Sequence, residues 1–182
     1  MPISLTHPRD KGFLIRTAVI LGALVGGLFF WVAQNLGLDR EQISPQAVWD
    51  YIHEVAPQQG IDPEFVYALA WAESSLDARA RSSEARGMMQ LTRPAWREVS
   101  DSSYRFAWDW KTNIRVAVDY LAFCKEFLQQ HDSFSYPLLG ASYRYGLYYV
   151  KKNNFDLGQL KQPENEIYKR IFRGVIRPVE GP

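Results

Sequence analysis

The chain has 182 residues, which is enough for one domain with its own hydrophobic core and too few for two large domains. Its formal net charge of +1 gives no reason to expect a nucleic acid or another polyanion as a partner. The single cysteine, Cys124, excludes an internal disulfide, and the scattered histidines form no zinc-type motif, so we expect neither a metal nor a cofactor.

An apolar run without charges, TAVILGALVGGLFFWVA, occupies residues 17–33. With the preceding residues 13–15 it approaches the roughly 20 apolar residues that a helix needs to cross a bilayer. Basic residues precede the run, and a positive flank stays on the cytoplasmic side of a membrane. We therefore expect a cytoplasmic stub at 1–12, a single transmembrane helix at 13–34 in the bacterial inner membrane, and a C-terminal body in the periplasm.

A cleaved signal peptide is the alternative interpretation of this run. Its cleavage site would require small residues at two positions, yet Trp31 stands two positions before Ala33. The pair Gly22 and Gly26 has the GxxxG spacing of packed membrane helices. Glycine is common in membrane helices in any case, so we assign the pair no role.

The body of the protein, predicted at residues 44–182 after a linker at 35–43, has the start and stop signals of helices. Prolines and capping side chains mark the starts, and apolar residues then recur at intervals of three and four. The sequence predicts one helix from Ser44-Pro45 to before Pro57, one from Asp62-Pro63 to about Glu73, a long one capped by Thr112 and continuing through Leu128, and shorter ones at 137–143 and 167–175. No apolar–polar alternation is sustained and no Asn-Gly or Asp-Gly hairpin signal occurs, so we expect a single all-α domain.

A carboxylate stands at the end of the second of these helices. If that helix starts at Pro63, then Phe65, Leu69 and Glu73 lie on one core-facing stripe at intervals of four. Desolvation and the negative end of the helix dipole both raise the pKa of a carboxyl placed there. A carboxylic acid that stays protonated near neutral pH suits general acid catalysis. A helix-terminal glutamate that bends out to solvent fits the spacing equally well.

Several segments, in the expected order, resemble the lytic transglycosylase family, whose SLT-type domain has a goose-type lysozyme-like fold. They are ESS at 73–75 with GMMQ at 87–90, NIRVAVDYL at 113–121, SYRYG at 142–146 and the stretch at 164–168. They are similar to the family's glutamate-serine pair, Gly-Leu-Met-Gln, Asn-Ile-x-x-Gly-x-x-Tyr-Leu, Ala-Tyr-Asn-Ala-Gly and Glu-Thr-x-x-Tyr elements. The resemblance extends over about residues 61–173.

This resemblance implies an enzyme that cleaves the β-1,4 bond between N-acetylmuramic acid and N-acetylglucosamine in peptidoglycan. Glu73 would protonate the glycosidic oxygen while the N-acetyl group of the substrate stabilises the developing cation. The ionised Glu73 would then take the proton of the 6-hydroxyl, which closes a 1,6-anhydro ring without a metal or a nucleotide. The expected partners are glycan strands, the membrane through the N-terminal helix, and an envelope-spanning machine.

By the same resemblance, the expected substrate-binding residues are Ser82, Met89, Gln90 and Tyr143. Ser82 and Gln90 would hydrogen-bond to the substrate, Met89 would line the groove, and Tyr143 would lie near the catalytic carboxyl. Methionine is more often core filler than a contact residue, whereas a glutamine among apolar neighbours must find hydrogen-bond partners. Gly87 would let the backbone approach closely where a side chain would obstruct.

Some positions depart from the family pattern. Arg144 and Tyr145 replace a small Asn-Ala pair, and the Arg144 guanidinium could pair with a peptide-stem carboxylate or with Glu73, whose pKa it would then lower. Glu84 could hold a water molecule near the cleft and favour hydrolysis, although a solvated loop charge is the simpler interpretation. Two alternatives therefore stay open, a muramidase that hydrolyses the same bond and a wall-binding scaffold without turnover.

Overall fold

Helices account for most of residues 40–182, the part of the chain that the computed structural model describes. In chain order the elements are α2 (Pro45–Val55), the 3-10 helix η1 (Pro57–Gln59), α3 (Pro63–Ser74), β1 (Ala85–Arg86), β2 (Leu91–Thr92), α4 (Arg93–Val99), η2 (Tyr104–Trp108), α5 (Trp110–Gln130), α6 (Tyr136–Tyr145), α7 (Leu147–Lys152), η3 (Leu157–Gln159) and α8 (Glu166–Phe172). The mostly helical fold predicted from the sequence is confirmed.

The predicted cytoplasmic stub and transmembrane helix, with the first part of the linker, lie outside the described residues. Within residues 40–182, no helix combines the length and the apolar character that a membrane span requires.

Capping side chains set the helix starts. Asp62 accepts a hydrogen bond from the backbone N–H of Phe65 at 3.0 Å, and Pro63 occupies the first turn of α3, as predicted. The predicted cap of α5 is wrong, because Asp109 and not Thr112 precedes the helix. Its carboxylate accepts from both the backbone N–H and the hydroxyl of Thr112, so the helix begins at Trp110.

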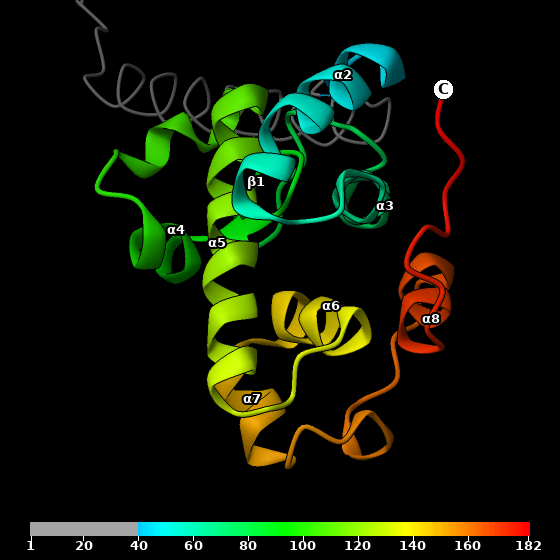
Figure 1. Cartoon of the computed structure of the whole chain (residues 1–182). Coiled ribbons are helices and arrows are strands. Elements are labelled where there is room, and N and C mark those ends of the chain that lie inside the picture. Colours follow the sequence, from blue (N-terminus) through cyan, green and yellow to red (C-terminus); the bar gives the residue numbers. More distant parts are fainter. Residues whose placement is uncertain (1–39) are drawn as a thin grey trace, which may run out of the picture. The chain divides into compact units, whose positions relative to one another are not determined.

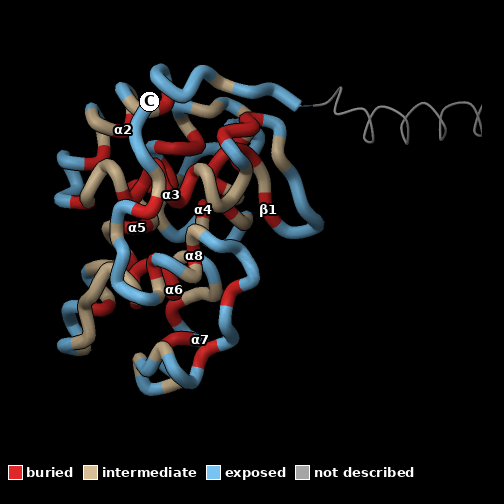
Figure 2. The backbone as a smooth tube through the Cα atoms, turned by 90° about the vertical axis from the view of Figure 1, so that its right-hand side faces the viewer, coloured by how far each residue is buried: buried red, intermediate tan, exposed pale blue. Residues whose placement is uncertain are grey.

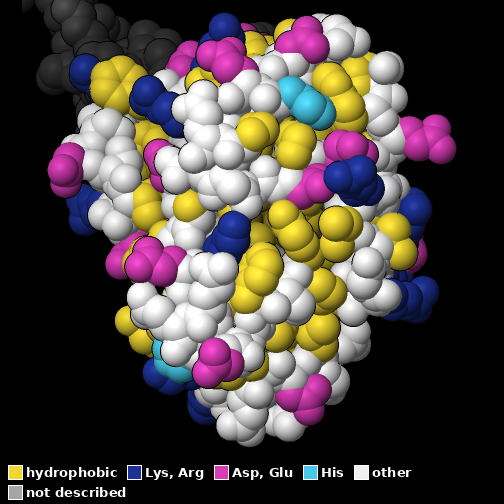
Figure 3. All heavy atoms as spheres, viewed as in Figure 1, with side chains coloured by type: hydrophobic (Ala, Val, Ile, Leu, Met, Phe, Trp, Pro, Cys, Tyr) yellow, Lys and Arg dark blue, Asp and Glu magenta, His cyan; other side chains and the backbone are white. Residues whose placement is uncertain are grey.

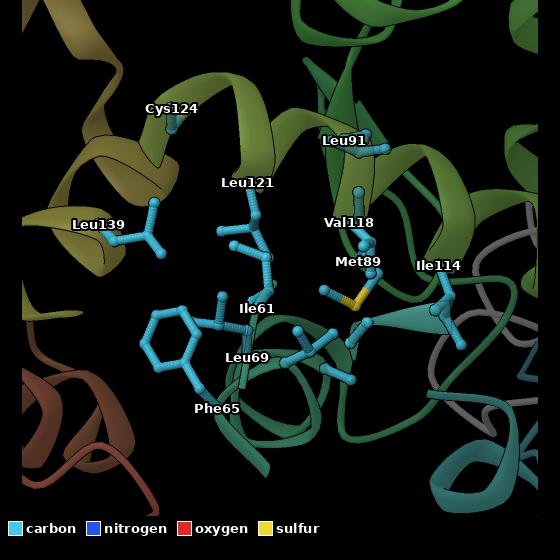
Figure 4. Packing of buried hydrophobic residues seen from close by; sticks show 14 of the residues in the cluster. Ile61, Phe65, Leu69, Met89, Leu91, Ile114, Val118, Leu121, Cys124 and Leu139 are labelled. Atoms are coloured by element: carbon cyan, nitrogen blue, oxygen red, sulfur yellow. The ribbon is translucent and has the colours of Figure 1, made fainter. Parts of the chain in front are cut away.

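The longest helix, α5, lies at the centre of the described region, and α2, α4 and α6 pack on it (Figure 1). Its buried side chains include the predicted stripe Ala117, Leu121, Cys124 and Leu128. This stripe belongs to one apolar cluster with residues of α3 and α6. Figure 4 shows its Leu121 and Cys124 together with Phe65 and Leu69 of α3 and Leu139 of α6. The helix α8 packs against both α3 and α6, so these three helices converge beside the core.

A short β-hairpin departs from the predicted all-α class. The strands β1 and β2 are antiparallel, with Ala85 opposite Thr92 and Arg86 opposite Leu91. Each strand has two residues, which is too few to produce a recognisable alternation of apolar and polar positions. The GMMQ segment at 87–90 is the loop of this hairpin.

Both ends of the described chain fold back onto the domain. Ile43 donates its backbone N–H to the carbonyl of Leu76, and the carbonyl of Glu41 accepts from Ala78, so the last residues of the predicted linker belong to the folded domain. At the other end, Gly181 lies against the Trp49 ring of α2. Figure 2 shows the C-terminal end of the chain beside α2. The predicted last helix ends earlier than expected, at Phe172, because Gly174 follows with a positive φ of 92°.

Candidate active site

Glu73 lies in the last turn of α3, and only 6% of its side chain is exposed. The preceding residues Phe65–Ala70 are all buried, so the helix is held in the core just before this carboxyl. The helix ends immediately afterwards, because Ser75 and Leu76 adopt left-handed backbone angles with φ of 55° and 64°. The core-facing position predicted from the spacing is therefore present, and the carboxyl does not bend out to solvent.

Two side chains from distant parts of the chain contact the Glu73 carboxyl. The hydroxyl of Tyr168 on α8 donates to Oε1 at 2.5 Å. The Nη1 atom of Arg144 on α6 donates to Oε2 at 3.2 Å. The sequence left two partners open for Arg144, a peptide-stem carboxylate and Glu73. In the structure the guanidinium pairs with Glu73.

These contacts and the burial act on the Glu73 carboxyl in opposite directions. Burial raises the pKa of Glu73 above its ordinary value, because a desolvated carboxylate is costly. The Tyr168 hydroxyl and then the positive charge of Arg144 lower this pKa, but their combined effect is smaller than that of burial. The pKa of Glu73 is thus raised, as expected from its position on the helix, and the group is suited to hold a proton.

The N-terminus of α8 is tied directly to the end of α3, and this tie positions Tyr168. Asn165 caps α8 by accepting from the backbone N–H groups of Ile167 and Tyr168. The Asn165 side chain also donates to the carbonyl of Ala72 at 3.3 Å. Tyr168 is the last residue of the motif at 164–168, which is the signal for it in the sequence, but that motif alone does not indicate its contact with Glu73.

Tyr143 lies near the Glu73 carboxyl, but its hydroxyl bonds elsewhere. It donates to the carbonyl of Met89 at 2.6 Å. Burial, followed by the negative charge of Glu73, raises the pKa of Tyr143 well above its usual range, so the phenol keeps its proton. The tyrosine hydroxyl that contacts Glu73 therefore belongs to Tyr168, while Tyr143 anchors the GMMQ loop.

Asn113 holds the same loop from α5, and the sequence reasoning missed its role. Its buried amide accepts from the N–H of Met89 at 2.7 Å and donates to the carbonyl of Arg86 at 3.2 Å. Gly87, with φ of 80°, packs so closely that an added Cβ would lie 2.2 Å from the carbonyl oxygen of Ala107. The close approach expected at Gly87 thus occurs within the protein. The only signal for Asn113 was its place at the start of the NIRVAVDYL segment.

The other predicted substrate-binding residues fall into different surroundings. The Met89 side chain is fully buried in the core rather than lining an open groove (Figure 4). Ser82 is exposed, and its hydroxyl accepts from the N–H groups of Glu84 and Ala85 in the turn before β1. Gln90 is partly exposed and donates to the carbonyl of Gly87 at 3.0 Å. Contact of these residues with a substrate stays a prediction.

A cleft opens beside Arg144. One pocket of about 220 Å³ is lined by Gln90, Leu91, Thr92, Ala95, Tyr120, Tyr143, Arg144, Tyr145 and Gly146. A second, of about 330 Å³, shares Ala95, Tyr120, Tyr145 and Gly146 with it and adds Pro94, Glu98, Phe123, Phe127, Leu147, Tyr148 and Tyr149. We call the two together the aromatic cleft. Tyr148 on its rim is 83% exposed, which suits a ring that stacks on a ligand.

The surface around α6 and the side chains that could bind a metal ion show what the site can offer to a ligand. Figure 3 shows hydrophobic side chains gathered around the position of α6 on the face seen in Figure 1. Within residues 40–182, no group of histidine, cysteine and carboxylate side chains is arranged to hold a metal ion. Glu84 is exposed in the turn before β1. The described site therefore offers one buried acid, two hydrogen-bond donors to it, and an adjoining cleft rich in aromatic rings.

Comparisons with known proteins agree with this geometry. Residues 50–165 match the family model of the transglycosylase SLT domain, which is more than half of the chain. A similar solved structure is an inactive glutamate-to-glutamine mutant of the lytic transglycosylase Slt from Pseudomonas aeruginosa, at 19% identity and a TM-score of 0.52. The match covers 71% of this chain but only 22% of that one, so the likeness concerns the fold of one part of the relative. A search of curated proteins finds no match. The family match, supported by the likeness in fold, shows that the chain belongs to the transglycosylase SLT domain family.

Proposed function

We propose that the protein is a peptidoglycan lytic transglycosylase that cleaves the bond between N-acetylmuramic acid and N-acetylglucosamine and leaves a 1,6-anhydro end. The observation that carries the proposal is the buried carboxyl of Glu73, with its raised pKa, in a chain of the SLT family. The similar structure from Pseudomonas aeruginosa is named a lytic transglycosylase, and its glutamate-to-glutamine mutant is called inactive, which supports a glutamate-dependent reaction.

In the first step Glu73 acts as the general acid. Burial favours the protonated form, so the carboxyl can donate its proton to the glycosidic oxygen as the bond to the sugar C1 breaks. The substrate N-acetyl group stabilises the positive charge that develops at C1. The carboxylate that remains accepts a hydrogen bond from the Tyr168 hydroxyl, which lowers the free-energy cost of the transfer.

In the second step the same group acts as the base. The ionised Glu73 takes the proton of the 6-hydroxyl, and the 6-oxygen attacks C1 and closes the anhydro ring. The proton from Glu73 stays on the hydroxyl of the leaving sugar, together with the electron pair of the broken bond. The proton of the 6-hydroxyl restores Glu73 to its acid form, so one carboxyl completes the cycle. This cycle is an exception to the pair of carboxylates that most glycosidases use.

The glycan strand would occupy the aromatic cleft and pass Arg144. Gln90 and Tyr143 line the cleft and are the predicted substrate contacts best placed for this path. Met89 would contribute through its backbone, because its side chain is buried. Ser82, which caps the turn before β1, would reach the strand only if the strand extends past the hairpin.

We further propose that residues 13–34 anchor the protein in the bacterial inner membrane, with the SLT domain in the periplasm, where it would open glycan strands locally, next to an envelope-spanning machine. The uncharged run at 17–33 and its basic flank support this location. Fractionation of cells, with mass measurement of the mature chain, distinguishes an anchored protein from one whose N-terminal segment is cleaved.

The activity is tested by digesting purified peptidoglycan with the full chain in mild detergent and identifying the products by mass. We expect 1,6-anhydro muropeptides from the parent and a loss of roughly 100-fold or more with Glu73→Gln, since a general acid contributes 10²–10⁴-fold. Glu84→Gln is the matched control, because it removes an exposed carboxyl from the neighbouring turn. It should leave the product yield unchanged.

Two other outcomes would overturn the proposal. Reducing ends in place of anhydro ends would identify a muramidase, and a loss of activity in Glu84→Gln would then point to the residue that positions the water. Folded protein that binds glycan but releases no product would identify a wall-binding scaffold.

A further inference from the structure

Arg144 lies at the boundary between the buried acid and the open cleft. Its side chain is 45% exposed, whereas that of its partner Glu73 is 6% exposed. The same arginine lines the pocket that contains Gln90 and Tyr143. The guanidinium therefore faces the buried carboxyl with one edge and the cleft with the rest of its surface.

The contact with Glu73 uses only part of the guanidinium. A single nitrogen, Nη1, approaches both carboxylate oxygens, at 3.2 and 3.5 Å. Arginine and carboxylate bind each other best through two nitrogens and two parallel hydrogen bonds, a mode that is not used here. Among residues 40–182, the Arg144 side chain makes no other hydrogen bond, so its remaining N–H groups can donate to a second partner in the cleft.

Aromatic stacking keeps the guanidinium at this place independently of the ion pair. The Arg144 Cζ atom lies 5.5 Å from the centroid of the Tyr168 ring. Tyr168 is itself buried and bonded to Glu73, so the platform under the guanidinium is fixed. An arginine held in this way can rotate toward the cleft without losing its position beside the acid.

We infer that Arg144 is a receptor for a carboxylate of the bound glycan strand, and that this carboxylate takes the place of Glu73 as its ion-pair partner. The inference rests on the proposed function and narrows it, since it makes the acidic groups of the strand part of substrate recognition. A planar guanidinium is well suited to select a carboxylate over a neutral hydroxyl, because it binds the carboxylate through two charge-assisted hydrogen bonds.

The exchange of partners would also act on the acid. Arg144 stabilises the ionised form of Glu73, so a substrate carboxylate that neutralises the guanidinium removes part of that stabilisation. The pKa of Glu73 therefore rises when an anionic strand binds, and a larger fraction of the enzyme holds the catalytic proton. Binding of the correct strand would thus prepare the acid.

Peptidoglycan offers this carboxylate from two sources. In a strand with peptide stems, the lactyl carboxyl of the muramic acid is bound in an amide, and the free carboxylates belong to the stem. In a strand without stems, the lactyl carboxylate itself is free. Both present the same chemistry to Arg144, so the test needs each of them together with its neutral amide.

The test measures binding of soluble glycan fragments by calorimetry to the full chain in detergent, in the Glu73→Gln background to prevent turnover. The fragments are a stem-free one and a stem-bearing one, each with its carboxylates free or converted to amides. We expect the free acid from at least one source to bind about tenfold or more tightly than its amide, as for a hydrogen bond to a charged group. Adding Arg144→Gln should reduce this ratio to about one, and Arg144→Lys should leave part of it.

Arg105→Gln is the matched control, because Arg105 is exposed on η2 and does not line the aromatic cleft. A ratio that is unchanged by Arg144→Gln, or a ratio of one in the Arg144-containing protein, would overturn the inference. The fragment, stem-free or stem-bearing, whose free acid binds more tightly than its amide identifies the source of the carboxylate. The peptidoglycan digest tests the proposed function separately. Anhydro products can form without any preference for a strand carboxylate, and a preference for the free acid over the amide can exist without turnover.

Discussion

Burial raises the pKa of Glu73, whereas the hydrogen bond from Tyr168 and the charge of Arg144 lower it. Of these three effects, the Tyr168 hydrogen bond can be removed with the smallest change to the site. Replacing Tyr168 by phenylalanine deletes the hydrogen bond that stabilises the ionised carboxyl, so the pKa of Glu73 should rise further. The alkaline limb of the pH profile of kcat/KM, which reports loss of the catalytic proton, should therefore move to higher pH. We also expect kcat to fall roughly tenfold or more, because a hydrogen bond to a charged group contributes about 1.5–3 kcal/mol.

The matched control for this prediction is Tyr104→Phe. Tyr104 is another buried tyrosine, and its hydroxyl donates to the carbonyl of Leu91 instead of to a carboxylate. This variant should leave the alkaline limb in place. If the alkaline limb of Tyr168→Phe lies at the same pH as that of the parent, Tyr168 has only a structural role.

The raised pKa of Glu73 also has a consequence for stability. The folded state binds this proton more tightly than the unfolded state, so the free energy of unfolding falls as the pH rises from the unfolded pKa through the folded pKa. At pH 8 the buried carboxylate therefore costs stability, and Glu73→Gln should be more stable than the parent at this pH. Glutamine still offers an oxygen to the Tyr168 hydroxyl.

Urea unfolding at pH 8 and at pH 4 tests this expectation. The gain should be present at pH 8 and shrink at pH 4, where the parent carboxyl is protonated in the folded state and mostly protonated in the unfolded state. A variant that is less stable than the parent at pH 8 would contradict a destabilising role for the buried carboxylate.

At the scale of elements, the hairpin that carries GMMQ depends on Gly87. Alanine at this position would have to adopt φ of 80° and would place its Cβ 2.2 Å from a backbone oxygen of Ala107, which no rotation of a side chain can relieve. Gly174 has a similar φ of 92° but nothing within 4 Å of the added atom. We expect Gly174→Ala to cost about 1–2 kcal/mol from the backbone angle alone.

Gly87→Ala should cost clearly more than this, roughly 3 kcal/mol or more, because the clash adds to the backbone strain. Chemical denaturation of both variants measures the difference. Gly87→Ala should also lower the activity, because the hairpin loop accepts a hydrogen bond from Tyr143, which lies near Glu73. Equal losses in the two variants would show that the hairpin shifts to relieve the contact.

The elements also show which features a sequence can predict. Helix starts and the placement of Glu73 depend on caps and on a period of three to four residues, and both are local. The contact of Tyr168 with Glu73 depends on how α8 packs on α3, which joins residues far apart in the chain. The side chain of Met89 faces the core because two-residue strands reverse the chain there, and such strands leave no periodic signal.

For the molecule as a whole, hydrogen bonds and ion pairs between segments that are distant in the chain position the Glu73 carboxyl. Glu73 belongs to α3, while its partners come from α6 and α8. The C-terminal tail returns to the start of the same helix, where Arg177 contacts the capping carboxylate of Asp62 at 2.7 Å. The beginning and the end of α3 are thus each held by a different region of the chain, and the catalytic geometry depends on the complete domain.

Residues 41–43 take part in this arrangement, which makes the start of the domain testable. Glu41 and Ile43 exchange backbone hydrogen bonds with the segment 76–78, and the N–H of Glu41 also donates to the buried carboxylate of Asp77 at 2.9 Å. This segment begins at Leu76, the second of the two left-handed residues that end α3 after Glu73. Removing residues 41–43 would leave the Asp77 carboxylate short of a donor and loosen the chain beside the acid.

We therefore expect a fragment of residues 44–182 to be less stable than one of residues 40–182 by about 1–3 kcal/mol, the range for a few hydrogen bonds that include one to a charged group. Urea unfolding of the two fragments at neutral pH gives the difference. The shorter fragment should also release muropeptides more slowly, because the carboxyl of Glu73 sits one turn away from the loosened segment. Superimposable unfolding curves would place the true domain boundary at Ser44, where the sequence predicts it, and would reduce residues 41–43 to a linker that touches the domain without supporting it.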